Sequence, residues 1–490
     1  MPTIMSKKYI YKLFIGIILT VFISEITRAQ NSQTLYYMNR IPQSTLMNPA
    51  IQPTCNFFLG LPVVSSIQMG AGNNQLALTD VIMKHPVNDS LITFLHPDAE
   101  FDKSDFLGKL DENNFFFEDF QTDLLSFGFR VNTWYFSFNL SEKMSLSINY
   151  PKDLLVLALE GNESFMNQTA DLSMLGVNML FYREYGLGVS KQINPNLTIG
   201  IRGKVLFGHV AAVTDNKSLG FYSSRDSLYI NANTIVNTSS PMIAKTNADG
   251  EFDGFDVPSY IENSETDSLI DLALAHQNMG LGIDLGIYYK PIDKLALSLS
   301  IVDLGYIKWN KDVTNLELNG DFTFKGIDAG EQITNDSIDD PFQIIVDSLE
   351  NSFKISNKSE SFTSGLGTKV YFGASWLVSN KFDLSVLSRT YFYNDNINQA
   401  FTFSANARPA RWLTTSVSYS IMNGTYNNIG FGLVLGGAPL QLYVITDNAS
   451  AALWGQNTSS FNFRFGLNVN IGCRKKSKDK DLPLLRRGFF

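Results

Sequence analysis

Apolar residues alternate with polar or small residues over much of this chain. The clearest example is Phe461–Ile471, in which every second residue is apolar and the residues between are Asn, Arg or Gly. This period of two is that of an extended strand with unlike faces, because successive side chains of a strand point to opposite sides. The same pattern predicts fourteen strands: Cys55–Gly70, Ser126–Phe138, Lys143–Tyr150, Met179–Gln192, Leu197–Gly208, Met279–Lys290, Lys294–Leu304, Gly367–Val378, Lys381–Tyr391, Phe401–Arg408, Trp412–Ile421, Asn428–Leu435, Leu440–Thr446 and Phe461–Ile471.

The connections between these segments alternate between short and long. Tight turns rich in turn-forming residues are expected at 141–142, 194–196, 291–293, 379–380, 409–411 and 436–439. Longer connections cover roughly 71–125, 151–178, 209–278, 305–366, 392–400, 422–427 and 447–460. Bacterial outer-membrane barrels have short periplasmic turns and long external loops, and an even strand number leaves both chain ends in the periplasm. A soluble sandwich gives no reason for this asymmetry, so the sequence predicts an all-β, transmembrane antiparallel β-barrel with long extracellular loops.

The two faces of the predicted strands differ as a barrel in lipid requires. One face is apolar and the other carries the small, polar and charged residues, as in Met279–Lys290. A basic side chain facing lipid at the bilayer midplane costs about 2–4 kcal/mol, so we expect charged residues to face the lumen. The lumen-facing candidates are Arg130, Arg202, Lys204, Asp284, Tyr288, Lys369, Arg408 and Arg464.

One predicted strand changes phase along its length. In Ser126–Phe138 the apolar residues begin on one face and end, at Trp134, Phe136 and Phe138, on the other. A β-bulge near Asn132–Thr133 would produce such a change. On this interpretation aromatic rings point into the lumen.

Composition fits a barrel and argues against several other classes of protein. The 490 residues include 37 Phe, 20 Tyr and 35 Gly, only 17% are charged, and the net charge is -9. Such an acidic balance offers no basic surface for nucleic acid. The four histidines show no metal-binding spacing, and no nucleophile elbow or phosphate loop occurs. We therefore expect no enzymatic activity, no metal site and no cofactor.

The N-terminus has the layout of a secretory signal peptide. Lys7, Lys8 and Lys12 precede an apolar run, Leu13–Ile26, which is followed by a small residue at Ala29. The run is too short for a membrane-spanning helix of about 20 residues. The expected organisation is a signal peptide at 1–29, an N-terminal periplasmic or plug segment at 30–54, the barrel at 55–472 and a basic periplasmic tail at 473–490.

The chain has two cysteines, Cys55 and Cys473, at the beginning of the first strand and directly after the last. If these two strands pair to close the barrel, both cysteines lie at the same periplasmic rim. They could then form a disulfide in an oxidising compartment, or remain two unpaired thiols.

Two short motifs carry a resemblance to known barrels. Asn48, Pro49 and Ala50 form an Asn-Pro-Ala box just before the first strand, and the chain from about 34 to 472 resembles the FadL family of outer-membrane transporters for hydrophobic compounds. Residues 182–208 are similar to a strand-turn-strand repeat of that family's PorV-like relatives in Bacteroidota. The resemblance implies an N-terminal plug that includes the box. It also implies apolar ligands that bind in the lumen and leave sideways through a distorted strand.

The start of the mature chain, residues 35–50, is also similar to PorP/SprF-like barrels associated with secretion and gliding. That similarity keeps a second function open, a barrel that anchors secreted or surface proteins and transports nothing. The expected partners are thus outer-membrane lipid, together with either a small hydrophobic ligand or secretion or surface proteins. A transporter should have an apolar cavity leading to a gap in the wall, and a scaffold should have a filled or polar lumen.

Overall fold

The computed structural model describes residues 33–87, 90–94, 96, 101–241, 243–246, 252–256, 276–324, 354–393, 396–422, 425–449 and 458–473. The predicted signal peptide and the predicted basic tail after Cys473 lie outside these residues. Within them, no helix has the length and apolar character needed to span a membrane.

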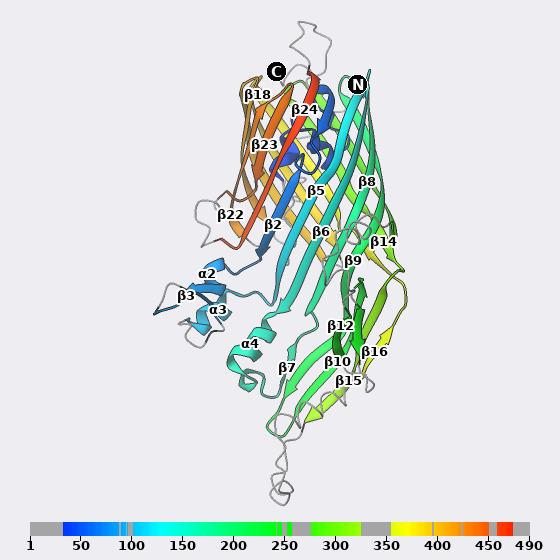
Figure 1. The fold of residues 1–490 in the computed structure, drawn as a ribbon. Coiled ribbons are helices and arrows are strands. Elements are labelled where there is room, and N and C mark those ends of the chain that lie inside the picture. The colour runs from blue at the N-terminus through cyan, green and yellow to red at the C-terminus, as the bar shows by residue number, and fades with distance from the viewer. Residues whose placement is uncertain are drawn as a thin grey trace, which may run out of the picture.

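The described chain forms a closed antiparallel barrel of fourteen strands, which confirms the predicted fold class (Figure 1). The wall is made, in chain order, by β1 (Cys55–Gly60) with β2 (Ile67–Asn73), β5 (Asn113–Val131), β6 (Trp134–Pro151), β8 (Gly176–Asn194), β9 (Leu197–Ser223), β13 (Met279–Ile292), β14 (Leu295–Trp309), β17 (Phe362–Gly365) with β18 (Thr368–Ser379), β19 (Phe382–Tyr393), β20 (Asn396–Ala410), β21 (Leu413–Met422), β22 (Thr425–Gly436), β23 (Leu440–Thr446) and β24 (Ser460–Cys473).

Short turns join strand pairs at one end of the barrel, here called the turn end, and the longer connections leave from the other, the loop end. The loop end carries α2 (Leu78–Val81), β3 (Ile82–Lys84), β4 (Leu91–Thr93), α3 (Lys103–Lys109), α4 (Lys152–Glu160), η3 (Glu163–Phe165), β7 (Gln168–Asp171), β10 (Leu228–Ser239), β11 (Ile243–Thr246), β12 (Phe252–Asp256), β15 (Val313–Phe324) and β16 (Lys354–Lys358). Strand β9 continues past the barrel and pairs there with β7 and β10, while β10 pairs with β15. The wall thus extends into a sheet beyond the loop end (Figure 1).

Alternation along each strand sorts the side chains between lipid and lumen. On β13, Leu281, Leu285 and Ile287 are exposed on the outside, whereas Asp284 and Tyr288 are buried inside. Strand β24 behaves in the same way, with its phenylalanines outward and its asparagines buried. The exposed apolar residues around the barrel are those of a surface that faces lipid.

The prediction for the second and third strands was wrong. The phase change near Asn132–Thr133 is a two-residue hairpin turn between β5 and β6, and it is not a bulge. Asn132 has a φ of 53°, the left-handed conformation that Asn tolerates in such turns. The predicted turn at 141–142 lies inside β6, and the strand before the hairpin begins at 113, which keeps the count at fourteen.

This hairpin also corrects the expectation of aromatic rings in the lumen. Phe129 pairs with Phe136 across the two strands, and their ring centroids stack 5.3 Å apart. Trp134 and Phe136 are 40% and 36% exposed on the outer surface. The reversal at the turn returns the apolar residues of β6 to the same outer face as those of β5.

The first strand is interrupted, where a continuous one was predicted. Gly60 pairs with Asn468 and Ile67 pairs with Phe465, so the first strand advances seven positions while β24 advances three. Residues 61–66 stand opposite only two residues of β24 and form a wall distortion that stays hydrogen-bonded on both sides. The Leu61 amide donates to Leu467 and the Val63 amide donates to the carbonyl of the neighbouring β5 strand.

A disulfide joins Cys55 to Cys473 in register between the first and last strands. The bond closes a loop of 418 residues and fixes the seam of the barrel at the turn end. We expect oxidised, fully denatured protein to migrate faster than reduced protein on a gel, because the closed loop makes the unfolded chain more compact. A Cys473→Ser variant should migrate like reduced protein under both conditions, and equal mobility of oxidised and reduced wild type would contradict the bond.

Candidate functional site

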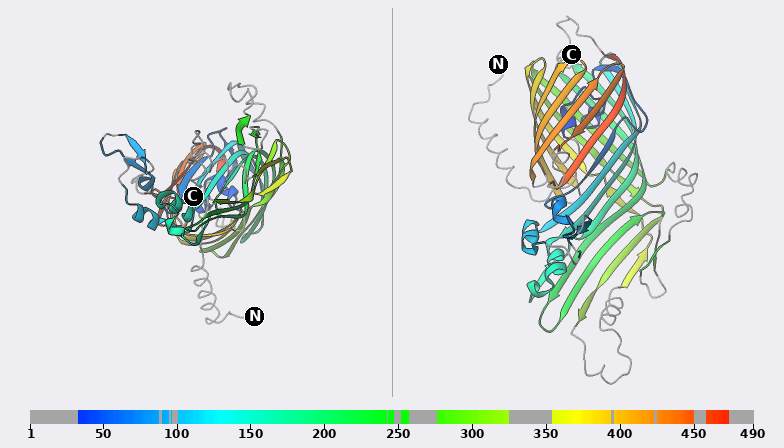
Figure 2. Two further views of the ribbon diagram at one scale, coloured as in Figure 1. Left: turned by 90° about the horizontal axis from the view of Figure 1, so that it is seen from below. Right: turned by 60° about the vertical axis from the view of Figure 1, so that its left-hand side comes forward.

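A segment from the start of the described chain fills the turn-end half of the lumen. Residues 33–54, here called the plug, contain two short 3-10 helices, η1 (Thr34–Tyr37) and η2 (Pro42–Leu46), and almost all of their side chains are buried. Seen along the barrel axis, the plug lies inside the ring of strands (Figure 2). Its apolar residues, among them Leu35, Met38 and Ile41, pack against lumen-facing Tyr371 and Tyr443 of the wall.

Polar contacts hold the plug to several strands. Asp447, just after β23, accepts hydrogen bonds from the amides of Gln33 and Thr34 at 2.8 and 2.9 Å. The Thr34 hydroxyl also contacts that of Ser418 on β21 at 2.7 Å. The side-chain amides of Gln43 and Asn468 bond to each other in both directions, at 2.8 and 3.0 Å. These contacts are separate hydrogen bonds, so a movement of the plug could break them in sequence.

Buried tyrosines of η1 add further links. The Tyr37 hydroxyl donates to the backbone carbonyl of Val386 at 2.5 Å, and the Tyr36 hydroxyl donates to Ser298 at 3.1 Å. Burial raises the pKa of both hydroxyls above the usual value for tyrosine. They therefore stay protonated and remain donors through the physiological pH range.

The Asn-Pro-Ala box packs directly against the wall. The Asn48 side chain accepts a hydrogen bond from the Ala50 amide at 2.9 Å, which closes a local turn. Two inward-facing glycines, Gly200 on β9 and Gly286 on β13, lie beneath the box. A Cβ at Gly200 would lie 2.3 Å from Pro49 backbone atoms, and one at Gly286 would lie 2.2 Å from Asn48 Oδ1. The close packing therefore depends on glycine at both wall positions.

On the loop-end side of the plug, charged residues from several strands form a network. At its centre Glu184 of β8, which is fully buried, contacts Lys143 Nζ at 2.7 Å and also bonds the Arg202 guanidinium. Arg202 reaches Asp284 at 2.9 Å, and Lys204 contacts the same carboxylate at 2.6 Å. Burial of a charged side chain is costly unless the charge is paired and hydrogen-bonded, and these charges are.

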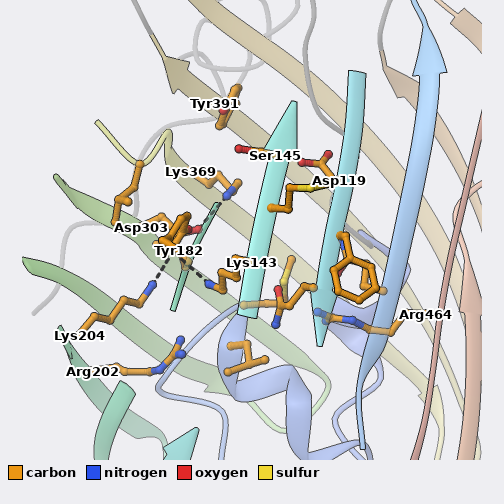
Figure 3. Close-up of a pocket in the computed structure, with 18 of the residues that line it drawn as sticks. Asp119, Lys143, Ser145, Tyr182, Arg202, Lys204, Asp303, Lys369, Tyr391 and Arg464 are labelled. Atoms are coloured by element: carbon orange, nitrogen blue, oxygen red, sulfur yellow. Dashed lines mark hydrogen bonds and ion pairs between the residues drawn. The ribbon is translucent and has the colours of Figure 1, made fainter. Parts of the chain in front are cut away.

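A third carboxylate, Asp303 of β14, contacts three lysines of this network. Lys204 lies 2.5 Å and Lys369 2.7 Å from its oxygens, and Lys143 lies 3.8 Å away (Figure 3). The Asp303 amide donates to Asp284 at 2.8 Å and so links the two carboxylates. The network thus fixes the relative positions of strands β6, β8, β9, β13, β14 and β18.

The sequence-predicted lumen residues fall into two groups. The structure brings Arg202, Lys204, Asp284 and Lys369 together in the network. The others lie outside the network: Arg130 bonds the plug at Gln52 and Pro53, Arg408 pairs with Asp383, and Tyr288 is buried near the plug. Arg464 lines the same cavity as the network residues but forms no ion pair with them.

Sequence reasoning missed the two carboxylates that organise the network. Glu184 lies in the polar phase of its strand, together with Gly186 and Gly188, and that phase was the available signal. Asp303 lies within a register shift between β13 and β14 and has a φ of 60°. Its direction could not be read from simple alternation, because the irregularity resets the phase.

A cavity of about 90 Å³ lies between the plug and this network (Figure 3). Its charged lining is mostly basic and consists of Lys143, Arg202, Lys204, Lys369 and Arg464, with Asp119 and Asp303 as the acidic members. A volume of this size holds several water molecules or one small polar group. Among the described residues, no group of three or more His, Cys, Asp or Glu side chains is arranged to hold a metal ion.

Residues 49–447 match the model of a family of unknown function (DUF5723). The chain belongs to this family. The matched region of the DUF5723 chain begins inside the Asn-Pro-Ala box and runs through β23 to the aspartate that bonds the plug. A search of curated protein sequences gives no match.

Solved structures that match this chain include two toluene transporters and a FadL homologue. The Ralstonia pickettii toluene transporter TbuX matches at 8% identity and a TM-score of 0.40, over 87% of this chain and 93% of that one. The Pseudomonas putida toluene transporter TodX matches at 9% and 0.36, over 91% and 98%. A Pseudomonas aeruginosa FadL homologue matches at 9% and 0.36, over 88% and 94%. Similarity this low carries no functional assignment, and the expected Bacteroidota subgroup stays a prediction.

Proposed function

We propose that this protein is an outer-membrane barrel that binds small hydrophobic or amphiphilic compounds and lets them pass when its plug moves. The observation that supports this most is the plug itself, which occupies the lumen and is held to the wall by hydrogen bonds and apolar packing. The cavity next to it has a largely polar lining, so an apolar path requires displacement of the plug. In this proposal the described structure is the closed form.

The wall distortion at 61–66 supplies a candidate exit. Its Ser65 carbonyl accepts hydrogen bonds from the plug residue Gln43 at 3.3 Å and from Tyr443 at 2.8 Å. A plug that withdraws therefore releases one of the bonds that hold the distortion to the lumen. Because the distortion has more residues than the facing segment of β24, it can change shape while the strands of the barrel stay paired.

Covalent attachment of the plug tests this proposal. Thr34 and Ser418 side-chain oxygens are 2.7 Å apart, so cysteines at both positions should form a disulfide between η1 and β21. We expect Thr34→Cys/Ser418→Cys protein to block uptake of an apolar dye into proteoliposomes, and reductant to restore it. The two single variants, and wild type with and without reductant, control for the native disulfide.

Equal uptake by the locked and reduced double variant would show that the plug does not gate passage. Mass spectrometry of small molecules retained on natively purified protein then identifies the compounds that bind. Retention of apolar or amphiphilic compounds supports the proposal, and their absence argues against it.

A second function, anchoring of surface or secreted proteins, is favoured by two features. The sheet formed by β7, β9, β10 and β15 extends beyond the barrel and offers a large surface outside the membrane region (Figure 1). A filled lumen also suits a barrel that transports nothing. Recovery of a stoichiometric protein partner, without any retained apolar compound, would favour this function.

A further inference from the structure

The cavity beside the plug contains an arginine whose charge the described residues leave poorly compensated. Arg464 of β24 is 2% exposed and lines the cavity. Its Nε has no hydrogen-bond acceptor in the described part of the chain. No carboxylate among these residues is recorded within 4.0 Å of the guanidinium, although Asp123 acts on it electrostatically from farther away. The other basic residues around the cavity, by contrast, contact Glu184, Asp284 or Asp303.

A carboxylate in the same cavity is also incompletely satisfied. Asp119 of β5 lines the cavity, and its buried Oδ2 has no hydrogen-bond partner among the described residues. In Figure 3 Asp119 and Arg464 lie to the right of Asp303 and Lys204, and Lys369 acts on Asp119 electrostatically from across the cavity. One side of the cavity is therefore an ion network of four cations and three carboxylates. The other side presents a cation and an acceptor for which the described residues show no ion pair within 4.0 Å.

Buried polar groups in folded proteins are almost always hydrogen-bonded, and a buried charge without a partner is costly. A pair of such groups facing one cavity indicates a ligand that supplies both missing partners. A guanidinium binds carboxylate or phosphate through two parallel hydrogen bonds, and a carboxylate accepts from an ammonium or hydroxyl group. The available volume matches one such small group with its neighbouring donor.

We propose that this cavity binds a phosphate or carboxylate group that carries a nearby ammonium or hydroxyl, with Arg464 binding the anion and Asp119 accepting from the donor. The phosphoethanolamine group has this chemistry, both as a free molecule and as a phospholipid headgroup. Binding at this site does not require passage through the barrel. The binding proposal can therefore be tested separately from the gating function proposed above.

The test is calorimetric titration of the purified full-length protein in maltoside detergent and in buffer free of phosphate and carboxylate. The probes are inorganic phosphate, phosphoethanolamine and dihexanoyl phosphatidylethanolamine. We expect phosphoethanolamine to bind more tightly than phosphate, because it also satisfies Asp119. Tighter binding of the short-chain lipid than of free phosphoethanolamine identifies a lipid headgroup as the source, and the reverse order identifies a soluble compound.

Variants separate the two contacts. Arg464→Gln should weaken binding of all probes by at least about tenfold, since a charge-assisted hydrogen bond is lost. Arg464→Lys should retain part of the affinity. Asp119→Asn should keep phosphate binding and lose the preference for phosphoethanolamine. Arg225→Gln, which removes an exposed arginine from the turn between β9 and β10 at the loop end, is the control and should bind as wild type does.

Two results would overturn the proposal. One is the failure of both phosphate and phosphoethanolamine to bind wild-type protein. The other is affinity of folded Arg464→Gln protein within twofold of wild type. Heat-dependent gel migration establishes that each variant is folded, and the Asp119→Asn arm still decides the question if Arg464→Gln does not fold.

Discussion

Replacement of Gly200 by valine should displace the plug and open the barrel. The Cβ that valine introduces would lie 2.3 Å from the Pro49 backbone, and backbone atoms cannot move aside as the end of a flexible side chain can. Overpacking of this kind costs about 1–3 kcal/mol. If the barrel stays folded, that cost raises the population with a displaced plug by roughly 5- to 150-fold. We expect a matching rise in conductance across planar bilayers and in dye uptake by proteoliposomes.

The same strand supplies a matched control. Gly203 of β9 has open space where its Cβ would be, with no heavy atom within 4 Å. Gly203→Val should therefore leave both measurements at the wild-type level, although it adds the same side chain three residues away. Folded Gly200→Val protein with wild-type conductance would show either that the plug adapts in place or that it does not close the barrel.

The strands of this fold were predictable because their signal is local and repeated. A period of two recurs in every wall strand, and each tight turn needs only a few residues to be recognised. The failure at Asn132–Thr133 has a specific cause. Aromatic residues on both sides of the turn belong to the outer face, and a reversal within two residues resembles a bulge when only the phase is read.

The lumen was less predictable, because its contacts depend on register across strands that are far apart in the sequence. Arg202 and Asp284 were both expected inside, but only their register, opposite each other on β9 and β13, makes them partners. The plug posed a different problem. Residues 33–54 have no long amphipathic period, and their two 3-10 helices are defined by contacts with the wall.

Substitution of Glu184 by glutamine should cause the largest loss of stability in the lumen. The carboxylate is fully buried, contacts Lys143 and Arg202, and accepts a further bond from Asn139 at 3.0 Å. Glutamine keeps the size of the side chain but removes the charge, so the surrounding cations lose their central partner. Breaking a buried ion pair on one side costs roughly 3–5 kcal/mol. We expect a corresponding fall in the free energy of unfolding, measured in urea by the heat-dependent gel shift.

An exposed pair at the loop end provides the comparison that isolates burial as the cause. Glu317 lies 2.8 Å from Lys358, with side chains 26% and 46% exposed, and such pairs contribute about 0–1 kcal/mol. Glu317→Gln should therefore change the free energy of unfolding very little. Equal losses of that free energy in Glu184→Gln and Glu317→Gln would contradict the buried network as the source of stability. A Lys143→Met/Glu184→Gln double variant should lose less than the sum of its single variants. That non-additivity follows because removal of one buried charge lowers the cost of leaving the other without its partner.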